Sequence, residues 1–316
     1  MKESSMMEGV AILAVLIVIT LIVPNVLPKG STTQEARINS SESKISNNVS
    51  GVTLTAVNQT YSAPHLPYSR VISLGLGNAR YAYQPYQEYV TITNKGKTPI
   101  DITGWQLKNG KDKRGYELGG RLQNFSSDIA IIPQGTLVIS PRGPSLMQNV
   151  ILQRGEKAIV TTGRIANQSP YNIVSFKENM CSGYLGDLET YTFTPRLSRD
   201  CPRPADEPGV SSLTTECRKF IERMSPCRQP EFETRDKDGE ICINCVNGKL
   251  LSSSCVAFIK DHFNYGSCVS HHKNDPDFSS RTWRIFLGKG WEMWAQKYET
   301  MELFDSVGGL VDSYEY

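Results

Sequence analysis

The chain has 316 residues, of which 39% are hydrophobic, and this length suffices for one large or two ordinary domains with a packed core. Its 34 basic and 32 acidic residues leave a formal net charge of only +2. This balance excludes the broad electrostatic footprint of a nucleic-acid-binding protein, so binding of nucleic acid or another polyanion has no support from composition.

The first predicted element is a membrane-spanning helix. Residues 9–28 are uncharged and almost wholly apolar, and as a helix they reach about 30 Å, which is enough to cross a bilayer. A cleaved signal peptide is the alternative, but the flanking VPNVLPKGS lacks a small-residue cleavage pattern and the apolar stretch is long for one. We therefore predict a short tail over residues 1–8 and an uncleaved single-span anchor over residues 9–28.

Two opposing signals indicate on which side of the membrane the body of the protein, the part of the chain after the anchor, lies. Lys29, Arg37 and Lys44 follow the span and only Lys2 and the α-amino group precede it, which weakly favours a cytoplasmic body. Against this, every cysteine falls between Cys181 and Cys268, an even number in a short interval, as in the disulfide frameworks of oxidising compartments. The charge difference is small, so we expect an extracytoplasmic body at the cell envelope or surface.

Residues 29–67 are predicted to be a flexible tether. They are rich in Ser, Asn and Thr and contain almost no large apolar residues. Sequons for N-glycosylation occur in the chain at a frequency expected by chance, at Asn48, Asn58, Asn124 and Asn167.

Residues 68–178 carry short apolar runs that are separated by glycine-containing turns and recur every 8 to 15 residues or so, roughly the spacing of short strands. This spacing favours a β-sandwich or barrel over a parallel α/β sheet, since no intervening helical period is visible. The predicted strands are Val71–Leu76, Tyr89–Thr93, Ile100–Leu107, Ile129–Pro133, Thr136–Ser140, Ala158–Thr162 and Ile173–Phe176.

The composition changes at residues 179–277, which carry every cysteine and two segments of helical periodicity. The first segment places apolar residues from Leu213 to Met224 on one face, with Ser212 as a cap candidate. The second runs from Cys255 to Phe263 after cap candidates at Ser252–Ser254. The motif CRKFI of the first segment matches CVAFI of the second, so the region is predicted to be partly helical.

The cysteines are interpreted as structural disulfides. Cys242-Ile-Asn-Cys245 is compatible with half of a zinc site or a redox centre, but no second Cys-x-x-Cys accompanies it. Since eight cysteines allow on the order of 100 connectivities, the pairing stays open. One local hypothesis pairs Cys217 with Cys227 and Cys255 with Cys268, tying each helix to the loop after it. The candidate disulfide residues are Cys181, Cys201, Cys217, Cys227, Cys242, Cys245, Cys255 and Cys268.

Residues 278–316 return to strand patterns. Strands are predicted at Trp283–Gly288 and Glu299–Asp305, and Gly308-Gly309 is flanked by alternating residues typical of a β-hairpin. The tryptophans Trp283, Trp291 and Trp294 are expected in the core or in helix packing, although exposed aromatic residues would indicate a binding surface.

The segment Glu88–Asn109, EYVTITNKGKTPIDITGWQLKN, resembles the front half of a lamin-tail domain, an immunoglobulin-like β-sandwich of nuclear lamins and many bacterial surface proteins. The shared pattern is a strand Glu-x-Val-x-Ile-x-Asn, a turn, and Asp-Ile-Thr-Gly-Trp-x-Leu; Pro133, Gly135 and the residues after them resemble the next turn and strand. Thr91 departs from the family pattern. Thr300–Tyr316 is similar to the family's closing strands. The resemblance implies binding or structural roles, because lamin-tail domains are not catalytic.

The closing pattern arrives about 190 residues after the front half, far beyond an ordinary domain of this kind. The resemblance therefore implies a mainly β protein: an immunoglobulin-like, lamin-tail-like sandwich over residues 68–178 and 278–316, interrupted by the cysteine-rich, partly helical insertion 179–277, with an N-terminal transmembrane helix. In the alternative, Ala158–Phe176 completes one sandwich and the C-terminus begins a second, but a terminal hairpin alone is marginally stable.

No motif with complete catalytic or metal-binding spacing occurs, so no catalytic, cofactor or metal site is predicted. The acidic run Asp236–Glu240 resembles part of a calcium loop but lacks some of its ligands, so we predict a solvated turn there. The rival hypothesis is a metal-assisted hydrolase or nuclease that uses the histidines and acids His262, His271, His272, Asp275 and Asp277.

A small basic loop, with Lys111, Lys113 and Arg114, is a possible binding surface for phosphate or a cell-envelope polyanion; a charged loop that keeps a strand edge soluble is the alternative. The sequence as a whole predicts a membrane-anchored, non-catalytic binding, adhesion or scaffold protein without cofactors, whose partner is a protein or an envelope polymer. Its oligomeric state stays open.

Overall fold

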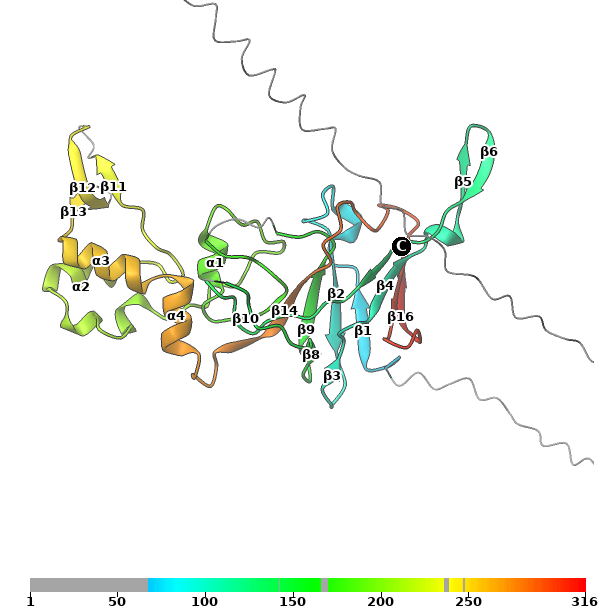
Figure 1. The fold of residues 1–316 in the computed structure, drawn as a ribbon, viewed down its shortest axis with the longest axis horizontal. Helices are drawn as coiled ribbons and strands as arrows, with labels where there is room; N and C mark the ends of the chain where they lie inside the picture. Colours follow the sequence, from blue (N-terminus) through cyan, green and yellow to red (C-terminus); the bar gives the residue numbers. More distant parts are fainter. Residues whose placement is uncertain (1–67, 142, 166–169, 236–238, 247) are drawn as a thin grey trace, which may run out of the picture. The chain divides into compact units, whose positions relative to one another are not determined.

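The computed structural model describes residues 68–316 except 142, 166–169, 236–238 and 247 (Figure 1). The expected tail, anchor and tether, residues 1–8, 9–28 and 29–67, lie outside the described residues. Within the described part, the helices are all too short or too polar to cross a bilayer.

A five-stranded sheet has the strand order β1-β2-β9-β14-β10. In β2 every second residue is buried, as the alternation of the sequence predicts. All its pairs are antiparallel except β9 with β14, which run parallel. The long connection between β9 and β14 makes this parallel pair possible. The strands are β1 (Ile72–Gly75), β2 (Tyr89–Asn94), β9 (Lys157–Thr161), β10 (Phe176–Asn179) and β14 (Ser279–Phe286).

A four-stranded sheet has the order β16-β15-β4-β7. Its strands are β4 (Gln106–Asn109), β7 (Ile129–Ile131), β15 (Thr300–Phe304) and β16 (Leu310–Glu315). Strand β15 pairs with β4, with Leu303 opposite Leu107, so the C-terminal hairpin joins the front strands as predicted. Gly308 in the hairpin turn has a φ of 87°, which glycine adopts without strain.

Three small sheets complete the strand pattern. The predicted strand Ile100–Leu107 is in fact two strands, because Gly104 has a φ of 79° and turns the chain between β3 and β4. Thr136–Ser140 forms no strand, only an isolated bridge at Thr136. The small sheets are β3 (Ile100–Asp101) with β8 (Ile151–Leu152), β5 (Gly115–Leu118) with β6 (Arg121–Asn124), and β11 (Glu233–Arg235) with β12 (Ile241–Val246) and β13 (Lys249–Leu250).

The α-helices α2, α3 and α4 begin at capping side chains, whereas α1 has no side-chain cap. Thr214 accepts a hydrogen bond from the Cys217 amide, so the predicted cap Ser212 is wrong; Ser212 ends a short 3₁₀ turn instead. Ser252 caps α3 as predicted, and Asn264 caps α4, a helix that the sequence did not predict. The α-helices are α1 (Gly183–Asp187), α2 (Thr215–Ile221), α3 (Ser253–His262) and α4 (Tyr265–His272), and the 3₁₀ turns are Ala79–Tyr81, Lys111–Lys113, Pro204–Asp206 and Val210–Ser212.

Buried side chains form two cores. The sheet core takes residues from both large sheets, and the cysteine core takes six cysteines and the helix faces. Ile139 and Ile173 also belong to the cysteine core, which therefore extends across the domain boundary predicted at residue 179. Trp283 and Trp294 are buried as predicted, but Trp291 is exposed because it belongs to the loop after β14. The described chain is thus mainly β, with a disulfide-bonded helical segment.

Glu88 fastens the loop that contains Met293 and Trp294 to the start of β2. Its fully buried carboxylate accepts the backbone N–H groups of Met293 at 2.7 Å and Trp294 at 3.2 Å. Burial raises the pKa of Glu88 from 4.5 to about 7, although these hydrogen bonds act in the opposite direction. The folded chain therefore binds a proton at Glu88 more readily than the unfolded chain does.

We expect the free energy of unfolding to fall as the pH rises from 4.5 to about 7. The contribution of Glu88 is complete below the pKa of the unfolded chain and is lost as the pH passes the raised pKa; about 3 kcal/mol is its upper bound. Denaturant titrations across this range check it in the wild type and in Glu88→Gln, whose amide does not titrate. The same pH dependence in both proteins would contradict the assignment.

Candidate functional site

All eight cysteines are in disulfides, as predicted: Cys181–Cys268, Cys201–Cys227, Cys217–Cys255 and Cys242–Cys245. The local hypothesis for their pairing is wrong. Cys217 and Cys255 each lie in the first turn of a helix and are buried in the cysteine core, so they join α2 to α3 and not to the loops that follow. The matching motifs CRKFI and CVAFI thus mark two helices that pack together.

The histidines of the rival hypothesis gather around Glu207, a buried residue that the sequence did not single out. His262 Nε2 lies 3.2 Å and His272 Nε2 lies 3.3 Å from carboxylate oxygens of Glu207. His272 Nδ1 lies 2.7 Å from Asp275 Oδ2, and the His271 ring stacks on His262 with centroids 4.6 Å apart. This histidine cluster belongs to α3, α4 and the residues beside them. His271 and His272 are the last two residues of α4.

In the histidine cluster, His262 and His272 are paired with carboxylates of the cluster itself. Both ring nitrogens of His272 face carboxylate oxygens, an arrangement that only the doubly protonated ring satisfies. Burial lowers the pKa of His272, but the hydrogen bonds to Asp275 and Glu207 outweigh it and the net shift is upward. Burial lowers the pKa of His262. Asp277, the fifth residue of the hypothesis, is exposed. Among the described residues no group of His, Cys, Asp and Glu could hold a metal ion.

The predicted basic loop is matched by acids. Its three cations form ion pairs with carboxylates of neighbouring segments. Two of these carboxylates belong to buried residues, Glu302 of β15 and Glu299 just before that strand. Phosphate would have to compete with these ion pairs. The pairs are Lys111 with Asp128 at 3.7 Å, Lys113 with Glu302 at 2.6 Å and Arg114 with Glu299 at 3.0 Å.

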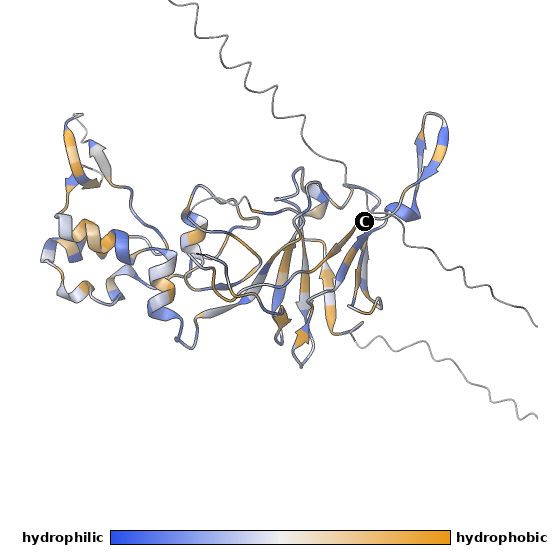
Figure 2. Cartoon of the chain, in the orientation of Figure 1, coloured by the Kyte–Doolittle hydropathy of each residue, from blue (hydrophilic) through white to orange (hydrophobic). Residues whose placement is uncertain are grey.

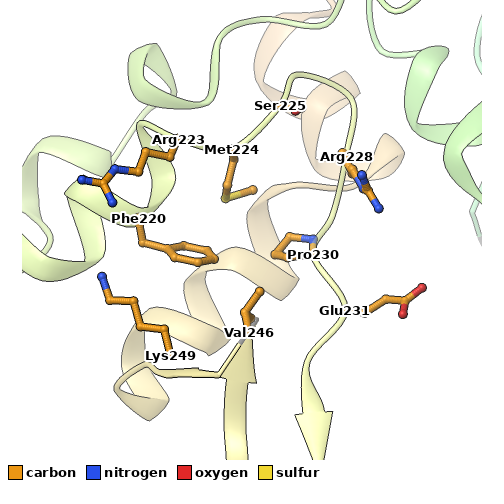
Figure 3. Close-up of a pocket in the computed structure, with 9 residues that line it drawn as sticks. All are labelled: Phe220, Arg223, Met224, Ser225, Arg228, Pro230, Glu231, Val246 and Lys249. Carbon is orange, nitrogen blue, oxygen red and sulfur yellow. The ribbon is translucent and has the colours of Figure 1, made fainter. Parts of the chain in front are cut away.

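A cavity of about 650 Å³ opens between the end of α2, the segment after it, and strands β12 and β13 (Figure 3). Its apolar residues are Phe220, Met224 and Pro230, which are half-buried, and Val246, which is buried. Figure 3 shows these side chains directed toward the middle of the cavity. The lining also contains Arg223, Ser225, Arg228, Glu231 and Lys249.

Three cations line the cavity, against one carboxylate, that of Glu231. Arg223 and Lys249 lie on either side of Phe220, and Arg228 lies on the side of Pro230 and Glu231 (Figure 3). All three cations are exposed, and their side chains form no ion pair with any described residue. Among the described residues, the positive charges of the cavity therefore have no ion-pair partner.

The strands beside the cavity carry exposed aliphatic side chains. Ile241 and Ile243 of β12 are 74% and 69% exposed, and Leu250 of β13 is 67% exposed. Figure 2 shows β12 as largely hydrophobic. No strand was predicted at β12, so this exposed strip was not expected from the sequence. The spacing of Ile241 and Ile243 was the signal that could have revealed a strand.

No protein-family model, no curated protein and no solved structure matches the chain. The histidine cluster and the cavity both gather polar side chains in the described part of the cysteine-rich segment. In the cluster His262 and His272 pair with acids, whereas the cations of the cavity have no ion-pair partner among the described residues and lie beside apolar side chains. The cavity is therefore the stronger candidate for a binding site.

Proposed function

We propose that the chain is a non-catalytic binding protein, anchored by a single N-terminal span, that presents a lamin-tail-like sandwich outside the cytoplasm and binds a protein partner at the cavity beside α2. The observation that carries this proposal is the cavity itself, in which Arg223, Arg228 and Lys249 surround apolar side chains and have no acidic partner among the described residues.

Three further features support the proposal. The pairing of β15 with β4 agrees with a sandwich closed by the C-terminal strands. The disulfides agree with an oxidising compartment, since such bonds are rare in reducing ones. The resemblance of Glu88–Asn109 to lamin-tail domains implies a binding or structural role. Nothing in the paired histidine cluster favours the metal-assisted hydrolase.

A protein partner suits the cavity better than an enclosed small molecule does. Small-molecule pockets bury most of the ligand surface. Here the cations are exposed and the aliphatic strip of Ile241, Ile243 and Leu250 extends along the neighbouring strands. Exposed apolar groups beside a polar rim are typical of protein–protein interaction sites.

Photo-crosslinking in intact cells tests the proposal. A photoreactive amino acid replaces Arg223 at the cavity or, as the control, Lys219, which is exposed on α2 just before Arg223 and does not line the cavity. We expect covalent adducts with discrete proteins from position 223 that are absent from position 219. Equal adducts from the two positions, or none from either, would contradict a partner site at the cavity.

A further inference from the structure

We infer that the cavity recognises an acidic partner segment that inserts one large apolar side chain between its carboxylates. The inference rests on the proposed function and names the chemistry of the partner. It follows from the way charge and apolar surface are arranged around α2 and β12.

The charges favour carboxylates on the partner. Arg223 and Lys249 flank Phe220 from two different parts of the chain, the turn after α2 and strand β13 (Figure 3). We call the large apolar side chain of the partner the anchor. A segment with an acidic residue on each side of this anchor can place one carboxylate near Arg223 or Lys249 and the other near Arg228. Complementary charges of this kind set the orientation of a partner and raise its association rate.

The apolar side chains of the cavity favour a partner whose anchor lies between its two carboxylates. Phe220, Met224, Pro230 and Val246 meet in a cavity of about 650 Å³, which has room for a large aliphatic or aromatic side chain. The unbranched side chain of Met224 can adapt to different anchors. Exposed ion pairs contribute little by themselves, so a buried anchor has to provide much of the affinity.

The same apolar side chains favour an acidic protein segment over a phosphate polymer as the partner. A polyanion would match Arg223, Arg228 and Lys249 but would leave the apolar side chains of the cavity uncovered. Its binding would depend on charge alone and would fall steeply with salt. An acidic segment with an anchor contacts both the cations and the apolar side chains of the cavity.

The test uses the full chain in nanodiscs of neutral phosphatidylcholine and fluorescence anisotropy of labelled synthetic peptides. The probe peptide carries a central leucine with acidic residues on both sides. Its controls replace the leucine by alanine or the acidic residues by lysines, and polyphosphate serves as a competing polyanion. We expect saturable binding of the probe, weaker binding of the alanine peptide and none of the lysine peptide.

The variant Arg223→Gln/Lys249→Gln should weaken binding of the probe up to about fivefold, because one carboxylate of the probe loses both cations that can face it. The control Lys219→Gln/Lys273→Gln removes the same charge from exposed positions that do not line the cavity and should bind like the wild type. Each of these changes lies on the surface, so the fold is retained.

Equal affinity for the leucine and alanine peptides, or for acidic and basic peptides, would overturn the inference. Complete displacement of the probe by polyphosphate at equal charge would also overturn it. If position 223 crosslinks to a partner in cells and the acidic peptide does not bind, the inference fails and the proposed function stands. If position 223 gives no adducts and the peptide does not bind, the proposed function fails as well.

Discussion

Removing the Cys181–Cys268 disulfide is expected to lower the free energy of unfolding by about 4 kcal/mol. The two cysteines are 87 residues apart in the sequence, and a bond that closes so long a loop restricts the unfolded chain strongly. Both sulfurs are also buried in the cysteine core, where they join the residues after β10 to α4. Denaturant titration of Cys181→Ala/Cys268→Ala measures the loss.

The matched control is Cys242→Ala/Cys245→Ala, which makes the same chemical change. These cysteines are only 3 residues apart, so their bond restricts the unfolded chain far less. We expect this variant to lose well under half of the stability lost in the first. Equal losses in the two variants would show that the long-range disulfide does not stabilise the cysteine core in the way described.

Breaking the buried ion pair of Arg284 and Glu178 is expected to cost about 3 to 5 kcal/mol, because one charge would stay buried without its partner. The Arg284 side chain is 4% exposed and that of Glu178 is 7% exposed. Arg284 also donates to the carbonyl oxygens of Pro195 at 2.7 Å and Arg196 at 3.1 Å. It belongs to β14, where Trp283 and Ile285 on either side belong to the sheet core.

Glu178→Leu removes the carboxylate, and its effect on the free energy of unfolding is measured beside two other variants. Glu178→Leu/Arg284→Met should recover part of the loss, since no charge then remains buried. Asp112→Ala removes the exposed partner of Lys108, which lies 2.8 Å away, and should cost less than about 1 kcal/mol. A loss for Glu178→Leu as small as that for Asp112→Ala would contradict the role assigned to the buried pair.

The strands with the clearest alternation were predictable from sequence. Val90 and Ile92 of β2 are buried and Thr91 between them is less so, which is the period of a strand with one buried face. The return of the chain to the front strands was also predictable, since Thr300–Tyr316 cannot form a stable hairpin alone. The parallel pairing of β9 with β14 was not predictable, because it depends on how the whole intervening segment folds.

Less of the candidate site could be predicted. The helical period identified α2 and α3, but the pairing of Cys217 with Cys255 depends on how the two helices pack. Glu207 has no neighbouring motif, and it meets His262 and His272 only through tertiary structure. Phe220 and Met224 were expected on one face of a helix, whereas Met224 lies beyond α2, which ends at Ile221, and both residues are half-buried at the cavity.

We propose that the binding site lies on the disulfide-bonded segment and that this segment is located in an oxidising compartment. Peptide mapping of the full chain from its own cells, without reduction and with elemental analysis, tests this claim most directly. We predict linked peptides for Cys181–Cys268, Cys201–Cys227, Cys217–Cys255 and Cys242–Cys245 and no bound zinc. Reduced cysteines together with stoichiometric zinc would contradict it.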